Sequence, residues 1–290
     1  MTRPHGFTLI ELAIVLVIIT ILVGGLAVPL SAQIQARRVA ETRASMQAIQ
    51  DAILGYAMSH TKSCSCSYDP DMDSDGDGDL SSTNPSTGCS DMCPLEGAPS
   101  NTLSFTRHYL PCPDDGTGIE AARSASGRCT TARGRLAWKT LGVGEADAWG
   151  QRFTYAVTPG FTDNDNGFIS TSTPFPTASP ATTPTNGTLD IYNSASCSGA
   201  GPASDAAVII ISHGPNGRGA QNVSGGTPLP PASVPADERQ NLPTYTSVAP
   251  CNVANTDFVS RTADTNFDDI VVWMSPNMLF SRVCPSGGCL

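Results

Sequence analysis

The sequence has few charged residues and no basic block. Only 14% of its 290 residues are charged, against about 25% in an average protein. Acidic residues outnumber basic ones by 26 to 16, and the resulting net charge of −10 argues against nucleic-acid binding. Apolar residues make up 40% of the chain, which argues against a disordered acidic protein. The length suffices for one large or two modest domains.

The sequence also lacks the motifs of common enzyme classes. Ser212 and His213 stand before a glycine-rich turn, but no G-x-S-x-G elbow surrounds them. The glycines of that turn do not have the spacing of a phosphate-binding loop, and no lysine accompanies them. We therefore expect no catalytic residues, and we interpret Ser212 and His213 as a polar pair at the end of a strand.

The apolar residues are concentrated near the N-terminus. Residues 7–30 read FTLIELAIVLVIITILVGGLAVPL and contain a single charge, Glu11. Because a helix of about 20 apolar residues spans a bilayer core, we expect a transmembrane helix over 7–30. An ordinary secretory signal is the alternative, but its apolar region is about 7–15 residues long and rarely holds a carboxylate. A carboxylate in the membrane costs about 2.5–3.5 kcal/mol, so Glu11 is expected to have a function and a partner.

The run GFTLIE at residues 6–11, after a short basic leader over 1–6, resembles the processing signal of type IV pilins and type II secretion pseudopilins. The resemblance implies that prepilin peptidase cleaves between Gly6 and Phe7, and that Phe7 is then N-methylated. It also implies that Glu11 pairs with the N-terminal amine of a neighbouring subunit in the filament core. Each of these charges is costly alone in lipid, and pairing offsets that cost.

A second helical pattern covers residues 31–60. Polar residues fill most of this segment, and its inward positions recur at spacings of three and four, at Val39, Thr42, Met46, Ile49, Ile53 and Tyr56. This stripe is typical of an amphipathic helix packed on a globular body. We expect one helix from Phe7 to about Ser59, with a local break near residues 24–29, where two glycines and a proline lie.

Residues 61–290 are expected to form an exported, β-rich globular domain. Period-two alternation over 153–157 and apolar runs over 206–212 and 268–273 predict three strands. Stretches rich in Thr, Ser, Pro and Gly predict long surface loops over 158–205 and 218–250. Segments at these strands, DAWGQRFTY, SHGPNG and DDIVVW, resemble parts of major pseudopilins. The expected fold is therefore α+β and pilin-like, a long N-terminal helix packed on an antiparallel β-sheet with disulfide-stapled loops.

All ten cysteines follow the helix, in the part of the chain that we expect to face an oxidising periplasm. Up to five bridges are possible, and sequence alone leaves their connectivity open. Proximity suggests Cys112 with Cys129, Cys284 with Cys289, Cys64 and Cys66 with Cys89 and Cys93, and Cys197 with Cys251. A zinc site built from the CxC and CxxxC pairs is the alternative.

An acidic loop at 69–79 is a candidate Ca²⁺ site, because it holds six aspartates in eleven residues. Gly76 allows the sharp turn of a calcium loop. Position twelve of an EF-hand would be Ser82 rather than Glu, so a standard EF-hand is not predicted, and a solvated acidic loop is the alternative. The candidate ligands are Asp71, Asp73, Asp75, Asp77 and Asp79.

The resemblance to major pseudopilins implies a second candidate Ca²⁺ site, formed by the turn at 212–217 and the closing strand. Its candidate ligands are Asn216, Asp268 and Asp269. Two departures weaken it: an asparagine stands where the family has an aspartate, and a long stretch separates the turn from Asp268. Ca²⁺ is the one cofactor that the sequence suggests.

The resemblance implies a structural subunit of a type IV pilus or a type II secretion pseudopilus. Its insertions make the chain larger than a major pseudopilin, which favours a minor subunit. The alternative is an adhesin or substrate-binding minor pilin at the filament tip, with a loop stabilised by Ca²⁺. The expected location is the inner membrane, crossed once, with the globular domain in the periplasm, and then the filament. The expected partners are other pilin or pseudopilin subunits, prepilin peptidase and an inner-membrane assembly platform.

Overall fold

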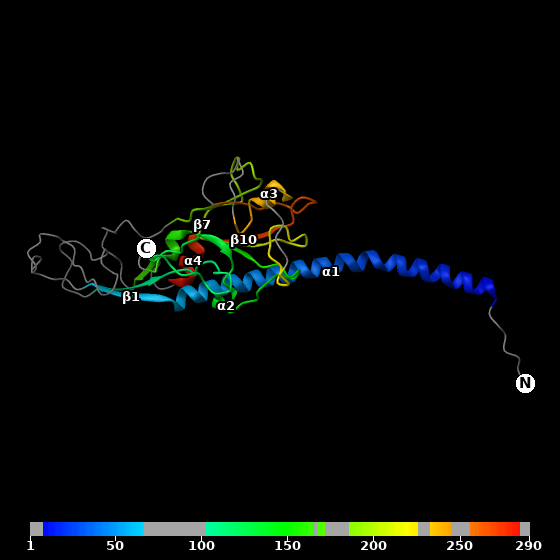
Figure 1. The fold of residues 1–290 in the computed structure, drawn as a ribbon, viewed down its shortest axis with the longest axis horizontal. Helices are drawn as coiled ribbons and strands as arrows, with labels where there is room; N and C mark the ends of the chain where they lie inside the picture. The colour runs from blue at the N-terminus through cyan, green and yellow to red at the C-terminus, as the bar shows by residue number, and fades with distance from the viewer. Residues whose placement is uncertain are drawn as a thin grey trace, which may run out of the picture.

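The computed structural model describes residues 8–66, 103–164, 167–171, 186–225, 233–244 and 256–284. Its longest element is helix α1 (Leu9–Ser59), half of which projects from a body of short strands and loops (Figure 1). Several predicted features lie outside the described residues: the leader with Gly6 and Phe7, the acidic loop at 69–79, and Cys89, Cys93, Cys251 and Cys289.

Helix α1 begins at a capping box. The Thr8 side chain accepts a hydrogen bond from the Glu11 backbone N–H, and the Glu11 side chain accepts one from the Thr8 N–H. This exchange satisfies two backbone donors that a helix N-terminus otherwise leaves unpaired. The helix ends at His60, whose backbone is extended, so the predicted end near Ser59 is confirmed.

The predicted break near residues 24–29 is wrong, because the backbone of α1 is helical through both glycines and Pro29. A proline removes one hydrogen bond, to the carbonyl four residues earlier, but its own φ of about −65° is compatible with a helix. The backbone on both sides of Pro29 is helical, so the loss of that one hydrogen bond does not interrupt the helix.

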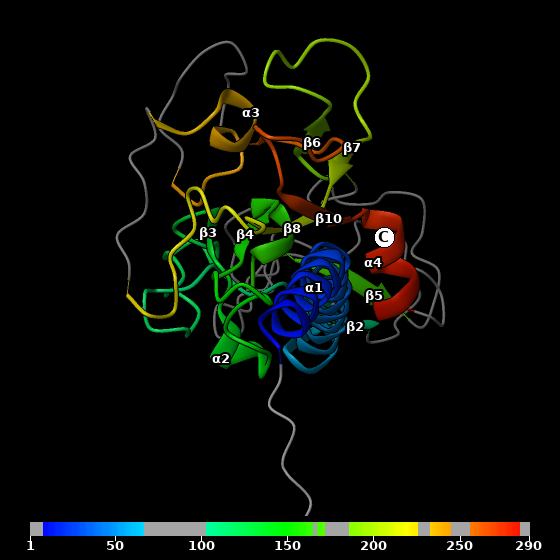
Figure 2. The same ribbon diagram turned by 90° about the vertical axis from the view of Figure 1, so that its right-hand side faces the viewer.

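The amphipathic half of α1 packs into the body as its periodicity predicts. Met46, Ile49 and Ile53 are at most 1% exposed. Around them α1 contacts helix α2 (Trp138–Leu141), helix α4 (Pro276–Val283) and strand β10 (Ile270–Met274). Viewed along its axis, α1 lies beneath a sheet with α2 and α4 on either side (Figure 2).

The central sheet has four antiparallel strands in the order β10-β8-β4-β3. Its other members are β8 (Val208–Ser212), β4 (Thr154–Val157) and β3 (Arg133–Arg135). Side chains of β8 and β4 alternate between two cores: Tyr155 and Ile210 face α1, whereas Ala156, Ile209 and Ile211 face away from it. Both faces of β8 are covered, which explains why its sequence is a continuous apolar run. The prediction that this strand lies in the interior of the sheet is confirmed.

Two smaller sheets complete the described body. One covers the outer face of the central sheet in the order β7-β6-β9, with β6 (Leu189–Tyr192), β7 (Ala203–Ala206) and β9 (Asp257–Val259). The other, β1-β2-β5, follows the end of α1 and consists of β1 (Thr61–Cys66), β2 (Leu103–His108) and β5 (Phe168–Thr171). All pairs are antiparallel except β6 with β9. The predicted α+β, pilin-like fold is therefore confirmed.

The prediction of surface loops over 158–205 and 218–250 is partly wrong. The first stretch contains β5, β6 and most of β7, and the second contains helix α3 (Ala236–Arg239). Leu189 and Ile191 are at most 1% exposed, because they pack on the outer face of the central sheet. This burial depends on a tertiary contact. Two alternating apolar residues among Ser, Thr and Pro are too few to predict a strand from the sequence.

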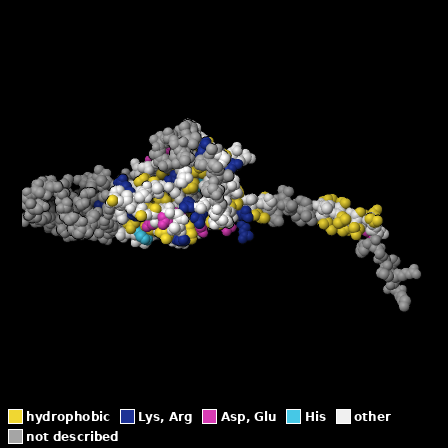
Figure 3. All heavy atoms as spheres, viewed as in Figure 1, with side chains coloured by type: hydrophobic (Ala, Val, Ile, Leu, Met, Phe, Trp, Pro, Cys, Tyr) yellow, Lys and Arg dark blue, Asp and Glu magenta, His cyan; other side chains and the backbone are white. Residues whose placement is uncertain are grey.

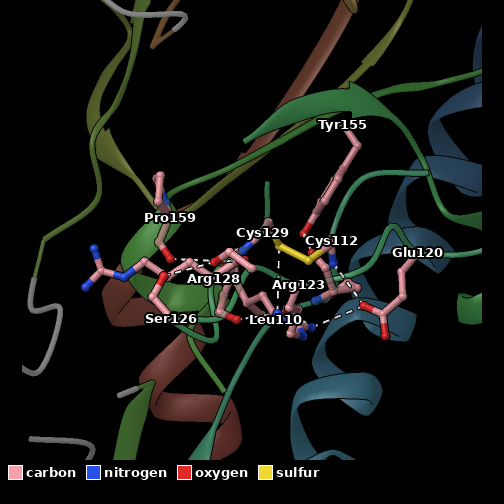
Figure 4. The surroundings of a disulfide bond; sticks show 12 residues. Leu110, Cys112, Glu120, Arg123, Ser126, Arg128, Cys129, Tyr155 and Pro159 are labelled. Atoms are coloured by element: carbon pink, nitrogen blue, oxygen red, sulfur yellow. Dashed lines mark hydrogen bonds and ion pairs between the residues drawn. A yellow bond between two sulfur atoms is a disulfide. The ribbon is translucent and has the colours of Figure 1, made fainter. Parts of the chain in front are cut away.

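A disulfide joins Cys112 to Cys129, the pair that sequence proximity suggests. Arg123 lies in the loop between them and donates hydrogen bonds to the Leu110 and Thr162 carbonyls and to Glu120 (Figure 4). Cys197 and Cys284 are also disulfide-bonded, and their predicted partners lie outside the described residues. The disulfide between Cys112 and Cys129 thus cross-links the body beside the end of α1.

Candidate functional site

The projecting half of α1 carries an apolar surface that the chain itself does not cover. Over residues 9–22 the exposure of the large apolar side chains runs from 49% at Ile19 to 89% at Leu9. The space-filling view shows these side chains gathered at the far end of the helix (Figure 3). An exposed apolar surface of this kind marks contact with other proteins or with lipid.

Glu11 is the one charged residue within residues 8–22. Its Oε2 accepts hydrogen bonds from the Thr8 N–H at 2.8 Å and from the Thr8 hydroxyl at 3.0 Å. The capping box therefore holds the carboxylate at the first turn of α1, where the helix dipole favours a negative charge. This arrangement presents a fixed anion within an apolar surface, which is what a cationic partner such as an amine requires.

A second group of acidic side chains gathers on the body. Glu238 of α3 and Asp268 and Asp269, which precede β10, each offer a carboxylate oxygen, and these oxygens lie within 4.8 Å of one another. Asn216, in the turn after β8, joins them: its N–H donates to Asp268 Oδ2 at 3.0 Å and its Nδ2 donates to Glu238 Oε1 at 2.7 Å. The structure thus brings together all three residues that the sequence suggested for the second site.

Glu238 is the member of this cluster that the sequence did not reveal. It lies on a helix of four residues, within a stretch that composition describes as loop. No motif marks it, and 30 residues separate it from Asp268. The sequence offers one signal for this residue, the acidic pair Asp237 and Glu238 in the first turn of a short helix. Acidic residues at this position are common because they interact favourably with the helix dipole, so the pair does not by itself indicate a site.

The cluster is buried and incompletely hydrogen-bonded. Glu238 is 0% exposed and Asp269 is 7% exposed. The Oδ1 atoms of Asp268 and Asp269 are buried and accept no hydrogen bond. Burial, reinforced by the neighbouring carboxylates and opposed by the Asn216 N–H, raises the pKa of Asp268 to about 6. The two Oδ1 atoms without hydrogen-bond donors could contact a cation, and an all-oxygen set of carboxylates suits a hard cation such as Ca²⁺.

His213, the residue after β8, lies beside this cluster and is fully buried. Its Nε2 is 2.8 Å from the Thr154 hydroxyl oxygen, and its Nδ1 is 3.5 Å from Asp269 Oδ1. The preceding Ser212 hydroxyl donates to Asp147 Oδ2 at 2.6 Å. Ser212 and His213 therefore contact different polar partners: Ser212 contacts Asp147, and His213 contacts Thr154 and Asp269.

The N-terminus matches a known family model. Residues 1–27 match the prokaryotic N-terminal methylation motif, and this match confirms the predicted pilin and pseudopilin signal. It includes the predicted cleavage site and Glu11. No curated protein and no solved structure matches the chain.

Within the described part of the chain, no helix combines the length and the apolar character needed to cross a membrane.

Proposed function

We propose that this chain is a pilin-like structural subunit of a type IV pilus or a type II secretion pseudopilus. The observation that carries the proposal is the methylation motif over residues 1–27. It is supported by the helix that follows, whose apolar half projects from the body and is exposed. Prepilin peptidase cleaves between Gly6 and Phe7, and the new N-terminus is methylated.

Assembly uses the projecting half of α1. This segment holds the subunit in the inner membrane, with the body in the periplasm, until the inner-membrane assembly platform extracts it into the filament. Exchange of lipid contacts for contacts with other apolar helices supplies little hydrophobic driving force, because both surroundings are apolar. Specificity therefore comes from the polar contact, in which Glu11 binds the N-terminal amine of a neighbouring subunit and each charge offsets the desolvation of the other.

The first experiment determines the mature N-terminus of the protein in the membrane fraction, by intact mass and N-terminal sequencing. A start at N-methylated Phe7 is expected. A Gly6→Val variant is expected to accumulate as the unprocessed precursor, because the peptidase would no longer accept the cleavage site. A mature start near Gln33, as an ordinary secretory signal would give, contradicts the proposal.

The second experiment isolates the role of Glu11. Glu11→Ala is expected to leave processing intact and to reduce incorporation into filaments, measured as the ratio of filament-bound to membrane-bound subunit. Glu41→Ala is the matched control, because Glu41 is an exposed carboxylate on the same helix but outside the apolar half. Normal incorporation of Glu11→Ala would contradict the proposed pairing of Glu11 with the N-terminal amine.

Within this class we assign the chain a minor role. The support is the material added to the central sheet: the β7-β6-β9 sheet and the stretch with α3. Labelling with gold-conjugated antibody against the body is expected to mark few positions on each filament. Label confined to filament tips, with surface binding lost in a chelator, would favour a tip adhesin, whereas even label along the filament would indicate a major subunit.

A further inference from the structure

Two arginines lie on α1 at the point where the helix leaves the body. Arg37 and Arg38 are exposed, and they follow Leu30, the last residue of the apolar run. At about 1.5 Å per residue, they lie about 10–12 Å beyond that run. Within the part of the chain that the structure describes, neither side chain makes an ion pair or a hydrogen bond. The space-filling view shows Lys and Arg side chains where the projecting helix emerges (Figure 3).

The body contributes an aromatic and apolar edge at the same level of α1. Trp149 is partly buried, and its Nε1 donates a hydrogen bond to Gln35 Oε1 at 3.3 Å. The N–H of Val223 donates to the carbonyl of the residue after Trp149 at 3.0 Å. The Val223 side chain is 43% exposed, and Ile34 on the helix is 46% exposed. Apolar side chains that the chain leaves open therefore lie beside the two arginines.

These groups share a level along α1 but lie on different sides of it. Gln35, which contacts Trp149, and Arg37 are separated by about 3 Å along the helix axis and by about 160° around it. A protein that approached α1 from the side of Arg37 would not reach Trp149. A flat surface that the helix crosses would contact both, and the surface of a bilayer has this geometry.

The chemistry of this level suits lipid headgroups. Tryptophan and arginine are typical of the membrane interface, where the indole contacts the headgroup region and the guanidinium binds phosphate. Side chains on a helix tilt toward its N-terminus, so Arg37 and Arg38 extend toward the apolar run. An anionic surface would repel a chain with a net charge of −10, and a local pair of cations offsets that repulsion where the body meets the membrane.

We infer that Arg37 and Arg38 bind the phosphate groups of anionic lipids in the leaflet that faces the body, with Trp149 and Val223 resting on the same headgroups. This contact sets how the body stands on the membrane before the subunit is extracted. The inference rests on the proposed function, because it requires the projecting half of α1 to lie in the bilayer.

The test reconstitutes the full chain into vesicles of phosphatidylglycerol and phosphatidylcholine in equal amounts. Bromine, which quenches tryptophan fluorescence on contact, is placed near the headgroup of one lipid or of the other. Lipids that mixed at random around the protein would quench equally in both cases. We expect brominated phosphatidylglycerol to quench about twofold more strongly than brominated phosphatidylcholine. Sodium chloride at about 1 M is expected to abolish this excess, because it screens exposed charges.

Two variants locate the contact. Trp149→Phe is expected to remove most of the quenching, because the other two tryptophans, Trp138 and Trp273, pack against the cores of the body. The double variant Arg37→Gln, Arg38→Gln is expected to lose the excess quenching by phosphatidylglycerol, because it removes the charges that attract the anionic lipid.

The double variant Arg128→Gln, Arg282→Gln is the matched control. It also removes two exposed arginines, but from the far end of the body. Arg128 precedes Cys129 in the disulfide beside the end of α1. Arg282 lies on α4, whose Phe280 ring is 5.9 Å from that of Phe168 in the sheet that follows α1. This control is expected to keep the excess quenching.

Flotation of the vesicles separates failure of this inference from failure of the proposed function. A chain that does not float with the vesicles contradicts both. A chain that floats overturns this inference alone if brominated phosphatidylglycerol gives no excess quenching, or if Arg37→Gln, Arg38→Gln retains it. If that variant retains the excess and is instead poorly incorporated into filaments, the arginines contact a neighbouring subunit and the inference is likewise overturned.

Discussion

The two halves of α1 differ in what covers them, although they form one unbroken helix. Over residues 9–22 the apolar side chains surround the helix and lie exposed, from 49% at Ile19 upward. Over residues 42–57 they form one stripe and are buried, with Ile53 at 0%. A single apolar stripe can be satisfied within the chain, whereas a helix that is apolar all round needs surroundings that the chain does not supply. The predictions below test this difference.

Truncation of an apolar side chain should have the largest effect, and only in the buried half. Ile53→Ala leaves a cavity among well-packed neighbours and is expected to lower the free energy of unfolding by about 2–5 kcal/mol. Ile18→Ala, at a residue that is 50% exposed, is expected to change it by less than about 0.5 kcal/mol. Urea unfolding followed by tryptophan fluorescence measures both. Equal losses would show that the two halves are covered alike.

The sequence predicted this contrast because the two halves have different periodicities. The stripe from Val39 to Tyr56 repeats every three or four residues, and the structure buries it from Thr42 onward and half-buries Val39. Strands β4, β8 and β10 were found for a similar reason, since each has a clear local pattern. The predicted break at residues 24–29 was wrong because it relied on local rules for glycine and proline, whereas the backbone is helical throughout this segment.

Elements that depend on tertiary contacts could not be predicted. Strand β6 is buried because Leu189 and Ile191 meet the outer face of the central sheet, and nothing in the neighbouring Ser- and Thr-rich sequence marks that contact. Glu238 was missed for the same reason, because its place beside Asp268 depends on how α3 docks. The resemblance identified Asp268 and Asp269, but it could not identify a neighbouring carboxylate from a segment outside its motifs.

Removal of the staple beside the buried half should have the next largest effect. The disulfide between Cys112 and Cys129 closes a loop with a sequence separation of 17, and loops of this size gain about 3 kcal/mol from the bridge. The double variant Cys112→Ala, Cys129→Ala is expected to lose that amount in urea unfolding under non-reducing conditions. Processing at Gly6 should stay normal, because this loop meets α1 at Tyr56, whereas Gly6 precedes the opposite end of the helix. Impaired processing would mean that the two halves of α1 are coupled.

The last buried turn of α1 is anchored to this loop by a hydrogen bond. The Tyr56 hydroxyl donates to Glu120 Oε1 at 2.8 Å. Tyr56→Phe removes the donor but keeps the ring, and is expected to cost about 1 kcal/mol of unfolding free energy. Tyr192→Phe on β6 is the matched control, since the Tyr192 side chain is only partly buried and lies away from α1. A larger loss at Tyr192 would contradict the role given to the Tyr56 hydroxyl.

The smallest expected effect is a pH dependence confined to the buried half. His108 at the end of β2 is 6% exposed, and its Nδ1 lies 2.9 Å from the Ala57 carbonyl oxygen of α1. Burial lowers the pKa of His108, although the hydrogen bond to Ala57 opposes that shift. An unfolded histidine titrates near a pKa of about 6.5, so below that pH the unfolded state gains a proton that the folded state does not. The contribution of His108 to stability should therefore fall as pH drops from about 6.5 toward the lowered pKa, while Asp268, whose pKa is raised to about 6, contributes in the opposite direction. His108→Gln, which retains a donor for Ala57, should remove this contribution, so that the stability difference from the unmutated protein changes as pH drops below about 6.5. A difference that stays constant over this pH range would contradict the role given to His108.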